Sequence, residues 1–354
     1  MLTICHQFQL KAKAVSCQPY GNGHINATYL VKTENGPDYI LQKLSRQAFH
    51  DIPALMQNIE RVTAYLAGQD PEPRHTLHLV PTLAGERYLH ASDGEFYRMY
   101  DFITHSVSLD RPERENDLYE CAYAFGRFQR ALESFPAQEL SETIPHFHDT
   151  PVRYQALHQA IAEDRLGRAK ECEQEIAFAL AREQEAASLV NQLAGGTLPL
   201  RVTHNDTKLN NVMLDTDTHK AVCVIDLDTV MPGLSAYDFG DLVRFGASTG
   251  AEDEQDLSKI GLSLPHYSQL LRGFLAGCGD RLTPAEIAAL PMGGKLMTLE
   301  CGVRFLTDYL MGDVYFHIHR PGHNLDRCRT QFKLVGSMEE NWSAMQSALR
   351  QADR

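Results

Sequence analysis

The sequence lacks the features that would place it in or across a membrane. Its 354 residues contain no apolar run of about 18 residues, the length that one membrane-spanning helix requires. The first residues show no basic stretch followed by an apolar stretch, the pattern of a secretory signal. Basic residues are also scarce, since 33 Lys and Arg stand against 46 Asp and Glu and the formal net charge is −13. We therefore expect a cytoplasmic protein with no basic surface for nucleic acid or for an anionic membrane.

Closely spaced cysteines are absent as well. The eight cysteines are scattered singly, and none forms the C-x-x-C pair of zinc sites and redox motifs. This distribution favours reduced thiols in a cytosolic protein over a disulfide framework. The chain is also longer than one ordinary hydrophobic core accommodates, so two domains are expected. These properties are typical of an enzyme that acts on small molecules.

One short segment carries most of the chemical information in the sequence. Residues 204–211 read His-Asn-Asp-Thr-Lys-Leu-Asn-Asn, and an apolar strand pattern over residues 221–225 ends in a further aspartate. This spacing matches the kinase catalytic loop H-x-D-x-K-x-x-x-N, followed by a metal-binding aspartate at the end of a strand. The Gly of the protein-kinase D-F-G motif is missing, because residues 225–228 read Ile-Asp-Leu-Asp. The pattern therefore predicts a small-molecule kinase rather than a protein kinase.

Each residue type in this segment suits one task in phosphoryl transfer from Mg-ATP. The protein must mainly position the acceptor hydroxyl and stabilise the negative charge of the phosphates. Asp206 is the predicted base, since a carboxylate in hydrogen-bond reach of a hydroxyl orients it and takes its proton. Lys208 is the predicted cation at the transferred phosphate. Asn211 and Asp226 supply the oxygen ligands that Mg²⁺ shares with phosphate oxygens, and they are the predicted metal residues.

Acidic residues that follow the predicted metal ligand allow further predictions. Asp228 lies two residues after Asp226, which predicts that both side chains lie on the same side of an extended strand. It is therefore either a second metal ligand or an anchor behind the metal site. Asp238, Asp241 and Arg244 recur at intervals of three residues, which predicts a charged network at the start of a helix that braces the catalytic loop.

The first hundred residues predict a small sheet lobe. Residues 14–44 alternate short apolar strands with turns, which indicates an antiparallel meander. An amphipathic helix is expected from Ile52, and the next strand candidates lie around the turns at residues 85–86 and 93–94, the last strand covering residues 96–103. The helix has apolar residues on one stripe at helical spacing: Leu55, Met56, Ile59, Val62 and Leu66.

The remaining residues predict a larger, mainly helical lobe. A helical stripe runs from Leu118 to Leu132, and residues 154–193 are expected to be helical with one interruption at Gly167. A break at residues 291–294 is expected before a last helix over residues 295–311. The predicted fold is α+β and two-lobed, like a protein kinase. Residues 1–103 would bind the nucleotide, and residues 104–354 would carry the catalytic and acceptor-binding groups.

A nucleotide site is predicted in the small lobe. The Gly21-Asn22-Gly23 turn joins two strands, where a flexible backbone can approach phosphates, although Asn-Gly is also the commonest hairpin turn. Lys43 ends the third strand, where kinases place the lysine that pairs with the α- and β-phosphates. Asp101 and Ile103, at the end of the last strand, complete the predicted nucleotide-binding set. Glu60 is the nearest acid that could pair with Lys43 from the helix, but it could equally be solvated.

The sequence resembles the aminoglycoside phosphotransferase and choline kinase superfamily, and within it the bacterial N-acetylhexosamine 1-kinases. The matching stretches extend through most of the chain and comprise residues 20–26, 40–44, 204–211, 224–233, 237–246 and 299–309. The catalytic loop is specific for the superfamily only. The stretches after Val224 and around Arg304 are those that resemble the narrower family.

The resemblance implies an activity and an acceptor site. It implies transfer of the ATP γ-phosphate, with Mg²⁺, to the anomeric hydroxyl of N-acetylglucosamine or N-acetylgalactosamine, with Asp206 next to that hydroxyl. It also implies that four further residues contact the sugar: His24, Phe245, Arg304 and Tyr315. The residues alone support other interpretations, because Arg304 lies four residues from both Glu300 and Asp308, the spacing of a surface salt-bridge ladder.

Two alternatives remain beside a sugar 1-kinase. The same catalytic residues would serve a kinase of another small hydroxyl compound, such as homoserine, choline, another sugar or an aminoglycoside, because acceptor choice is made in the helical lobe. An inactive, nucleotide-binding interaction module is the other alternative. The complete set of Lys43, Asp206, Asn211 and Asp226 argues against it, since an inactive relative is expected to have lost at least one of them.

Overall fold

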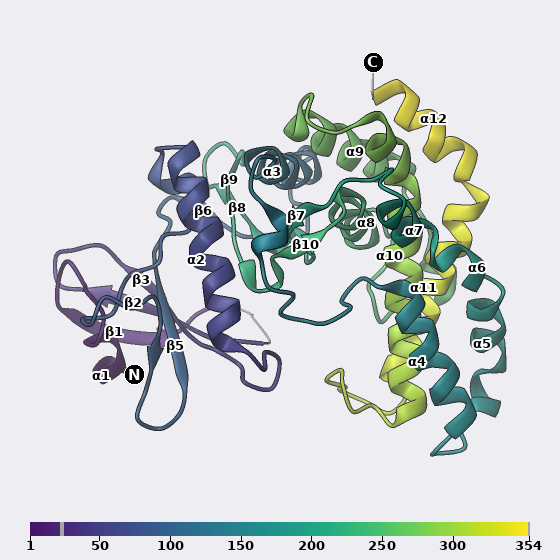
Figure 1. The fold of residues 1–354 in the computed structure, drawn as a ribbon, viewed down its shortest axis with the longest axis horizontal. Helices are drawn as coiled ribbons and strands as arrows, with labels where there is room; N and C mark the ends of the chain where they lie inside the picture. Colours follow the sequence, from purple (N-terminus) through teal and green to yellow (C-terminus); the bar gives the residue numbers. More distant parts are fainter. Residues whose placement is uncertain (22–24, 353–354) are drawn as a thin grey trace.

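The computed structural model describes residues 1–21 and 25–352. It has a small lobe built on a five-stranded antiparallel sheet and a larger helical lobe (Figure 1). This arrangement confirms the predicted α+β, kinase-like class. The strand order in the small lobe is β1 (Ala14–Pro19), β2 (Ala27–Thr33), β3 (Tyr39–Lys43), β5 (Phe96–Asp101) and β4 (Leu89–His90).

Both faces of the small-lobe sheet are covered. One face packs on α2 (Ile52–Gln69), whose predicted apolar stripe is buried except for the partly buried Leu66. The Asp51 carboxylate caps the N-terminus of α2 and accepts from the Ala54 amide at 2.9 Å. The other face packs against α1 (Leu2–Cys5) and the segment that follows it. Because side chains alternate across a strand, neighbours such as Gln42 and Lys43 lie on opposite faces of this sheet.

The junction of the lobes is formed by short strands around the catalytic loop. β6 (Ser106–Val107) pairs with β8 (Val212–Asp215), which pairs with β9 (Ala221–Val224), while β7 (Arg201–Thr203) pairs with β10 (Met231–Gly233). The chain leaves the small-lobe sheet after Asp101 and enters the second sheet at Ser106. One hydrophobic core includes residues from both sides of this crossing. The boundary at residue 103 therefore remains a prediction.

The large lobe consists mostly of helices around two further cores. Within the described residues, no helix is both long and apolar enough to span a membrane. The helices are α3 (Asp117–Ala131), α4 (Thr150–Glu163), α5 (Glu173–Leu180), α6 (Glu183–Ala186), α7 (Ser188–Ala194), α8 (Ser235–Gly246), α9 (Leu264–Cys278), α10 (Pro284–Met311), α11 (His323–Glu340) and α12 (Trp342–Ala352).

Two helix predictions were wrong. The stretch over residues 154–193 is not one helix with a single interruption but the end of α4 followed by α5, α6 and α7. Asp164 ends α4 in the left-handed conformation, with φ of 33°, and its carboxylate accepts from the Ala169 amide at 3.0 Å. This local hydrogen bond offers the backbone an alternative to continuing the helix.

The expected break at residues 291–294 does not occur. α10 passes through Pro291 without a break and begins at a capping box formed by Thr283 and Glu286. The glycines there serve close packing, because a Cβ atom on Gly293 would lie 2.1 Å from the carbonyl oxygen of Ala236 in α8. α10 is also not the last helix, since α11 and α12 follow it.

The contact between α8 and α10 yields a stability prediction. A Cβ atom on Gly240 would lie 2.3 Å from the carbonyl oxygen of Gly293 and 2.5 Å from Cγ of Met297. We expect Gly240→Ala to destabilise the protein by about 1–3 kcal/mol, because the two helix backbones must move apart. Gly336→Ala in α11 is the matched control, because a Cβ atom added there would meet no packed neighbour within 4 Å. Equal denaturant midpoints for the two variants would contradict this account.

Candidate active site

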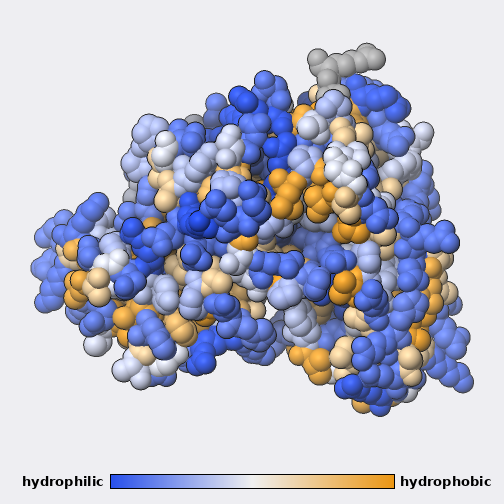
Figure 2. Space-filling view, in the orientation of Figure 1, coloured by the Kyte–Doolittle hydropathy of each residue, from blue (hydrophilic) through white to orange (hydrophobic). Residues whose placement is uncertain are grey.

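The catalytic loop lies between β7 and β8, where the lobes meet. The space-filling view shows this face of the molecule hollowed between the two lobes (Figure 2). His204 is fully buried, and its Nε2 lies 2.9 Å from the carbonyl oxygen of Ile225, which joins the loop to the end of β9. Asn205 in the loop and Asp226 after β9 both adopt the left-handed conformation, with φ of 64° and 60°, which Asn and Asp tolerate better than most residues. The loop and the strand end therefore form one unit.

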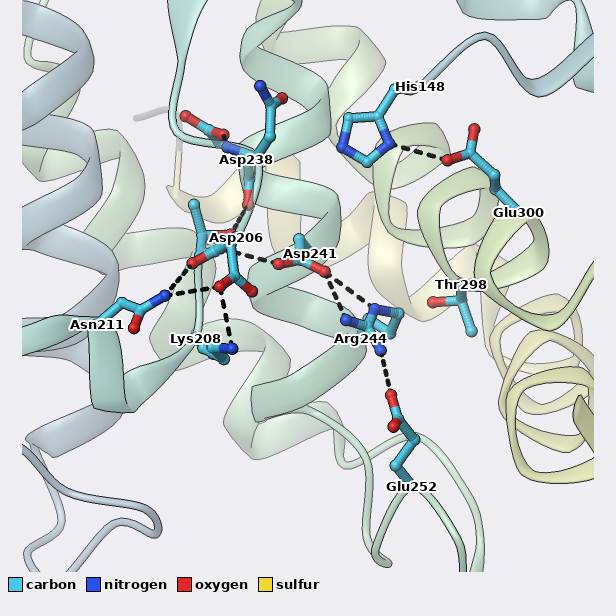
Figure 3. Close-up of polar contacts among 12 residues, drawn as sticks. His148, Asp206, Lys208, Asn211, Asp238, Asp241, Arg244, Glu252, Thr298 and Glu300 are labelled. Atoms are coloured by element: carbon cyan, nitrogen blue, oxygen red, sulfur yellow. Dashed lines mark hydrogen bonds and ion pairs between the residues drawn. The ribbon is translucent and has the colours of Figure 1, made fainter. Parts of the chain in front are cut away.

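The loop brings three of the predicted residues into contact (Figure 3). Oδ2 of Asp206 lies 2.9 Å from Nζ of Lys208 and accepts from Nδ2 of Asn211 at 2.9 Å. Nδ2 of Asn211 also donates to the Asp206 carbonyl oxygen at 2.8 Å. Burial alone would lower the pKa of Lys208, but the Asp206 carboxylate outweighs it and the pKa lies above its ordinary value. A charged lysine is therefore held beside the predicted base.

The predicted brace beneath the loop is confirmed. The Asp238 carboxylate accepts from the backbone amides of His204 at 3.0 Å and Asn205 at 2.8 Å. Asp241 accepts from the Thr207 amide at 2.8 Å and pairs with Arg244 at 2.9 Å. These carboxylates replace the hydrogen bonds that the irregular loop backbone cannot make with itself. The first turns of α8 therefore hold the conformation of the catalytic loop.

Negative charge is concentrated around Asp226. Burial, followed by the carboxylates of Asp228 and Asp206, raises the pKa of Asp226 to about 7. The positive charges of Arg98 and Lys208 oppose this rise only in part. Nδ2 of Asn211 donates to the Asp206 carboxylate, and the side-chain carbonyl oxygen of Asn211 points away from that contact (Figure 3). A carboxylate and an amide oxygen in a site with excess negative charge are a donor set that suits a hard divalent cation.

Asp228 is held by the small lobe. Its two carboxylate oxygens accept from Nη1 of Arg98 and from Nδ2 of Asn26, and all three residues are buried. With both oxygens engaged, the contacts favour the anchor over the second metal ligand. Arg98 was not predicted as a site residue. The available signal was a single arginine within an otherwise apolar and aromatic strand pattern.

The predicted nucleotide residues are placed less closely together. Gly21 has φ of 74°, a conformation that favours glycine, while Gly23 lies outside the described residues. Lys43 pairs at 3.0 Å with Glu95, which lies in the segment between β4 and β5. Glu60 pairs instead with Arg87 at 2.8 Å. Glu60 as the helix partner of Lys43 is therefore wrong, because Lys43 lies on the opposite face of β3 from α2.

The remaining predicted nucleotide residues lie where the chain crosses between lobes. Asp101 is the last residue of β5 and pairs with Tyr39 of β3. Ile103 is partly buried on the shared core, and its carbonyl oxygen accepts from the Ser106 hydroxyl at 2.7 Å. Their contact with a nucleotide stays a prediction.

Phe245 lies beside the catalytic loop. Its ring is 6.0 Å from Nζ of Lys208 and 3.7 Å from the guanidinium carbon of Arg244, and the residue is 38% exposed. The catalytic loop and Phe245, a predicted acceptor contact, are therefore neighbours in the fold. His24, also predicted to contact the acceptor, lies outside the described residues.

Arg304 lies among aromatic rings rather than carboxylates. Its guanidinium carbon is 5.2, 5.8 and 5.4 Å from the ring centres of Phe147, Tyr315 and Phe316. In the described part of the chain, no carboxylate lies within ion-pair distance of Arg304, so the predicted alternative of a salt-bridge ladder is wrong.

The two acids of that supposed ladder have other partners. Glu300 accepts from His148 and Thr150, at 2.9 and 2.7 Å. Asp308 accepts from the backbone amides of residues 314–316 at 2.8–3.0 Å and so holds the loop that carries Tyr315. Both acids therefore hold the surroundings of Arg304 through these contacts, and neither forms an ion pair with it in the described structure.

A second arginine adjoins Arg304. Burial, and then the positive charge of Arg304, lower the pKa of Arg153. Nη2 of Arg153 donates to the Phe147 carbonyl oxygen at 2.9 Å, while its buried Nε has no partner among the described residues. The segment around residues 147–153 was missed from the sequence, because neither a motif nor a periodic pattern marks it.

Comparison with known proteins shows the family. A model of the phosphotransferase enzyme family (APH) matches residues 16–270, so the chain belongs to that family. Among solved structures it is similar to a microcompartment-associated aminopropanol kinase, with 16% identity, a TM-score of 0.66 and 97% of each chain covered. A choline kinase from Cryptosporidium parvum Iowa II gives 12% identity and a TM-score of 0.59, covering 98% of this chain and 96% of its own.

A third similar solved structure contains bound ligands. An amicoumacin kinase in complex with AMP-PNP, Ca²⁺ and Ami gives 14% identity and a TM-score of 0.61, covering 92% of this chain and 89% of its own. At these identities the likeness shows the fold. Together with the family match, it identifies the chain as a phosphotransferase with a kinase-like fold.

Proposed function

We propose that this kinase transfers the γ-phosphoryl group of Mg-ATP to the anomeric hydroxyl of an N-acetylhexosamine, giving the sugar 1-phosphate. The chemistry follows from the catalytic loop. Asp206 accepts the hydrogen bond of the acceptor hydroxyl and takes its proton as the bond to phosphorus forms. Lys208, held at 2.9 Å from Asp206, stabilises the charge on the transferred group.

Asn211 and Asp226 are the proposed metal ligands. Their side-chain oxygens would hold Mg²⁺, which when bound neutralises phosphate charge. The excess negative charge around Asp226 supports this assignment, since a cation there would relieve the repulsion that raises its pKa. Gly21, Gly23, Lys43, Asp101 and Ile103 are the proposed nucleotide contacts.

The surroundings of Arg304 carry the choice of acceptor. An arginine that is framed by three rings and has no acidic partner in the described structure retains donors for a neutral, oxygen-rich ligand. Aromatic rings beside it, including the 66% exposed Tyr315, provide apolar surface for the faces of a sugar ring. Phe245 offers a similar surface beside Lys208. His24, Phe245, Arg304 and Tyr315 are accordingly the proposed sugar contacts.

The alternative acceptors differ in charge. Choline, ethanolamine, aminopropanol and aminoglycosides are cations, and two adjacent arginines with no acid paired to Arg304 among the described residues disfavour a cation there. Homoserine and other sugars are not disfavoured by this charge. The proposal for N-acetylhexosamines therefore depends on the sequence resemblance and on the charge of this region together.

A coupled ADP-release assay with Mg-ATP tests the proposal. N-acetylglucosamine and N-acetylgalactosamine should release ADP, whereas their 1-deoxy analogues, which lack only the anomeric hydroxyl, should not. ³¹P NMR of the product should show a glycosyl phosphate coupled to the anomeric proton. Turnover with choline, homoserine or an aminoglycoside instead of these sugars would show that the proposed acceptor is wrong, while the proposed kinase activity would stand.

Arg304 is the most direct test of the acceptor site. We expect Arg304→Ala to lower kcat/KM for the sugar by about ten- to a hundredfold, because a charged hydrogen bond is worth on the order of 1.5–3 kcal/mol. The KM for ATP should change little. Arg165→Ala is a matched control, since Arg165 is an exposed arginine of the same lobe that pairs only with Glu163 in the described structure. Unchanged sugar kinetics in Arg304→Ala would remove Arg304 from the acceptor site.

A further inference from the structure

A buried ion pair links the small lobe to the segment that carries Asp226. Arg98 on β5 is 1% exposed and Asp228 is 3% exposed, and Nη1 of Arg98 donates to Oδ1 of Asp228. Removing two charges from water is costly, and breaking such a pair leaves one charge buried without a partner. A pair of this kind is therefore a strong geometric constraint between the two lobes.

Several strands of the small lobe hold the arginine in place. Nε of Arg98 donates to Oε1 of Gln42 at 2.9 Å, and Nε2 of Gln42 donates to Oγ1 of Thr28 at 3.0 Å. The guanidinium also lies 5.2 Å from the ring centre of Tyr100. β2, β3 and β5 thus form a row of polar side chains that ends at Asp228.

A second contact reaches the same carboxylate from the segment after the glycine turn. Nδ2 of Asn26 donates to Oδ2 of Asp228, and Oδ1 of Asn26 accepts from the Ser45 amide at 3.0 Å. Both oxygens of Asp228 are therefore occupied by donors of the small lobe. Because Asp228 follows Asp226 by two residues, these contacts tie the segment of the proposed metal ligand to the small-lobe sheet.

Strand register explains why Arg98, and not Lys43, makes this connection. Gln42 lies opposite Arg98 and Lys43 lies opposite Tyr97 in the antiparallel pair of β3 and β5. Residues directly opposite share one face of the sheet, and successive residues alternate between faces. Arg98 therefore lies on the face toward the large lobe, while Lys43 lies on the other and pairs with Glu95.

We propose that Arg98 and Asp228 are positioning residues of the phosphotransferase, which set the place of Asp226 relative to the sheet over the nucleotide. Arg98 thereby connects the small lobe to the segment of Asp226, while Lys43 remains a proposed nucleotide contact. Asp228 acts through Arg98 and Asn26 rather than as a metal ligand. The proposal rests on the proposed role of Asp226 in holding the metal.

The test uses Arg98→Lys, Arg98→Met, Asp228→Asn and the double variant Arg98→Met/Asp228→Leu in the full chain. Each is measured for melting temperature, for ADP affinity with and without Mg²⁺, and for kcat and KM. We expect Arg98→Met and Asp228→Asn to lower kcat by about a hundredfold, the effect of a misplaced catalytic group. Arg98→Lys should recover part of the loss, and the KM for the acceptor should stay within about twofold, a margin smaller than the effect of one lost hydrogen bond.

The double variant separates positioning from stability. Because it removes both charges, its melting temperature should rise above that of Arg98→Met while its kcat stays low. Arg182→Met is the matched control, since Arg182 pairs with Glu339 at 2.7 Å far along the helical lobe and should change stability without changing kcat. If the Arg98 and Asp228 variants lowered only the melting temperature, the pair would be merely structural and the proposal would be overturned.

ADP binding distinguishes the two roles of Asp228. As an anchor that acts through Arg98, Asp228→Asn changes the gain in ADP affinity that Mg²⁺ brings no more than Arg98→Met does. Loss of that gain in Asp228→Asn, with the gain retained in Arg98→Met, would make Asp228 a metal ligand and overturn the proposal. Asp226→Asn is measured in parallel, and an intact Mg²⁺ effect in that variant would refute the metal assignment separately.

Discussion

Replacing Asp206 by Asn is expected to lower turnover by about 10²- to 10⁴-fold, the range of a positioned acid–base group. The amide keeps the shape of the side chain and an oxygen that can accept from Asn211 and Lys208, but it cannot take the proton of the acceptor hydroxyl. ADP affinity should survive, because the proposed metal ligands remain. Single-turnover kinetics with saturating Mg-ATP and a parallel ADP titration measure the two properties.

A nearby exposed aspartate provides the control for this variant. Asp217 lies in the turn between β8 and β9, and Asp217→Asn makes the same chemical change outside the catalytic loop. It should leave turnover unchanged. Near-wild-type turnover in Asp206→Asn would mean that another group accepts the proton or that transfer needs no base.

Replacing Asp226 by Ala is expected to abolish activity and to weaken Mg-nucleotide binding far more than acceptor binding. The reason is that the proposed metal would join the protein to the phosphates, and Asn211 alone would then hold it. Because Asp226 has φ of 60°, alanine also adds backbone strain at this position. Asp226→Asn is the cleaner companion, since asparagine tolerates the left-handed conformation and removes only the charge.

The Asp226→Asn variant should separate stability from activity. The pKa of Asp226 in the folded protein is raised to about 7, above its ordinary value in the unfolded chain, so stability is lost as the pH rises between these two values and the full cost of the ionised form is present above about pH 7. At pH 8 the neutral amide removes this cost, and the melting temperature should not fall while activity is lost. Retained Mg²⁺-dependent turnover would mean that the metal is held elsewhere, and Asp228 would then have to leave Arg98 and Asn26.

Much of the site was predictable because its residues are close together in the sequence. Asp206, Lys208 and Asn211 lie within six positions, and a loop of this length between two strands brings them into contact in almost any fold that keeps the strands. The brace from Asp238 and Asp241 was predictable for a different reason, since helical spacing places both carboxylates toward one side. The two lobes followed from the change of hydrophobic period along the chain.

Other features were decided by contacts between distant segments. Taken alone, Pro291 and the glycines after it suggest a break in the helix. In the fold, however, these glycines allow close packing against α8 within a continuous helix. The surroundings of Arg304 include Phe147, about 150 positions away, and no pattern along the chain connects them. Tertiary packing outweighs local propensity in both cases.

The Arg98–Asp228 contact between the lobes shows most clearly what could not be predicted from the sequence. The sequence alone indicated one cation from the small lobe, the lysine at the end of the third strand. Only the tertiary structure decided that Arg98 reaches Asp228 while Lys43 turns to Glu95. The physical reason is that a strand alternates its side chains between two faces, so a shift of one residue exchanges the buried partner for an exposed one.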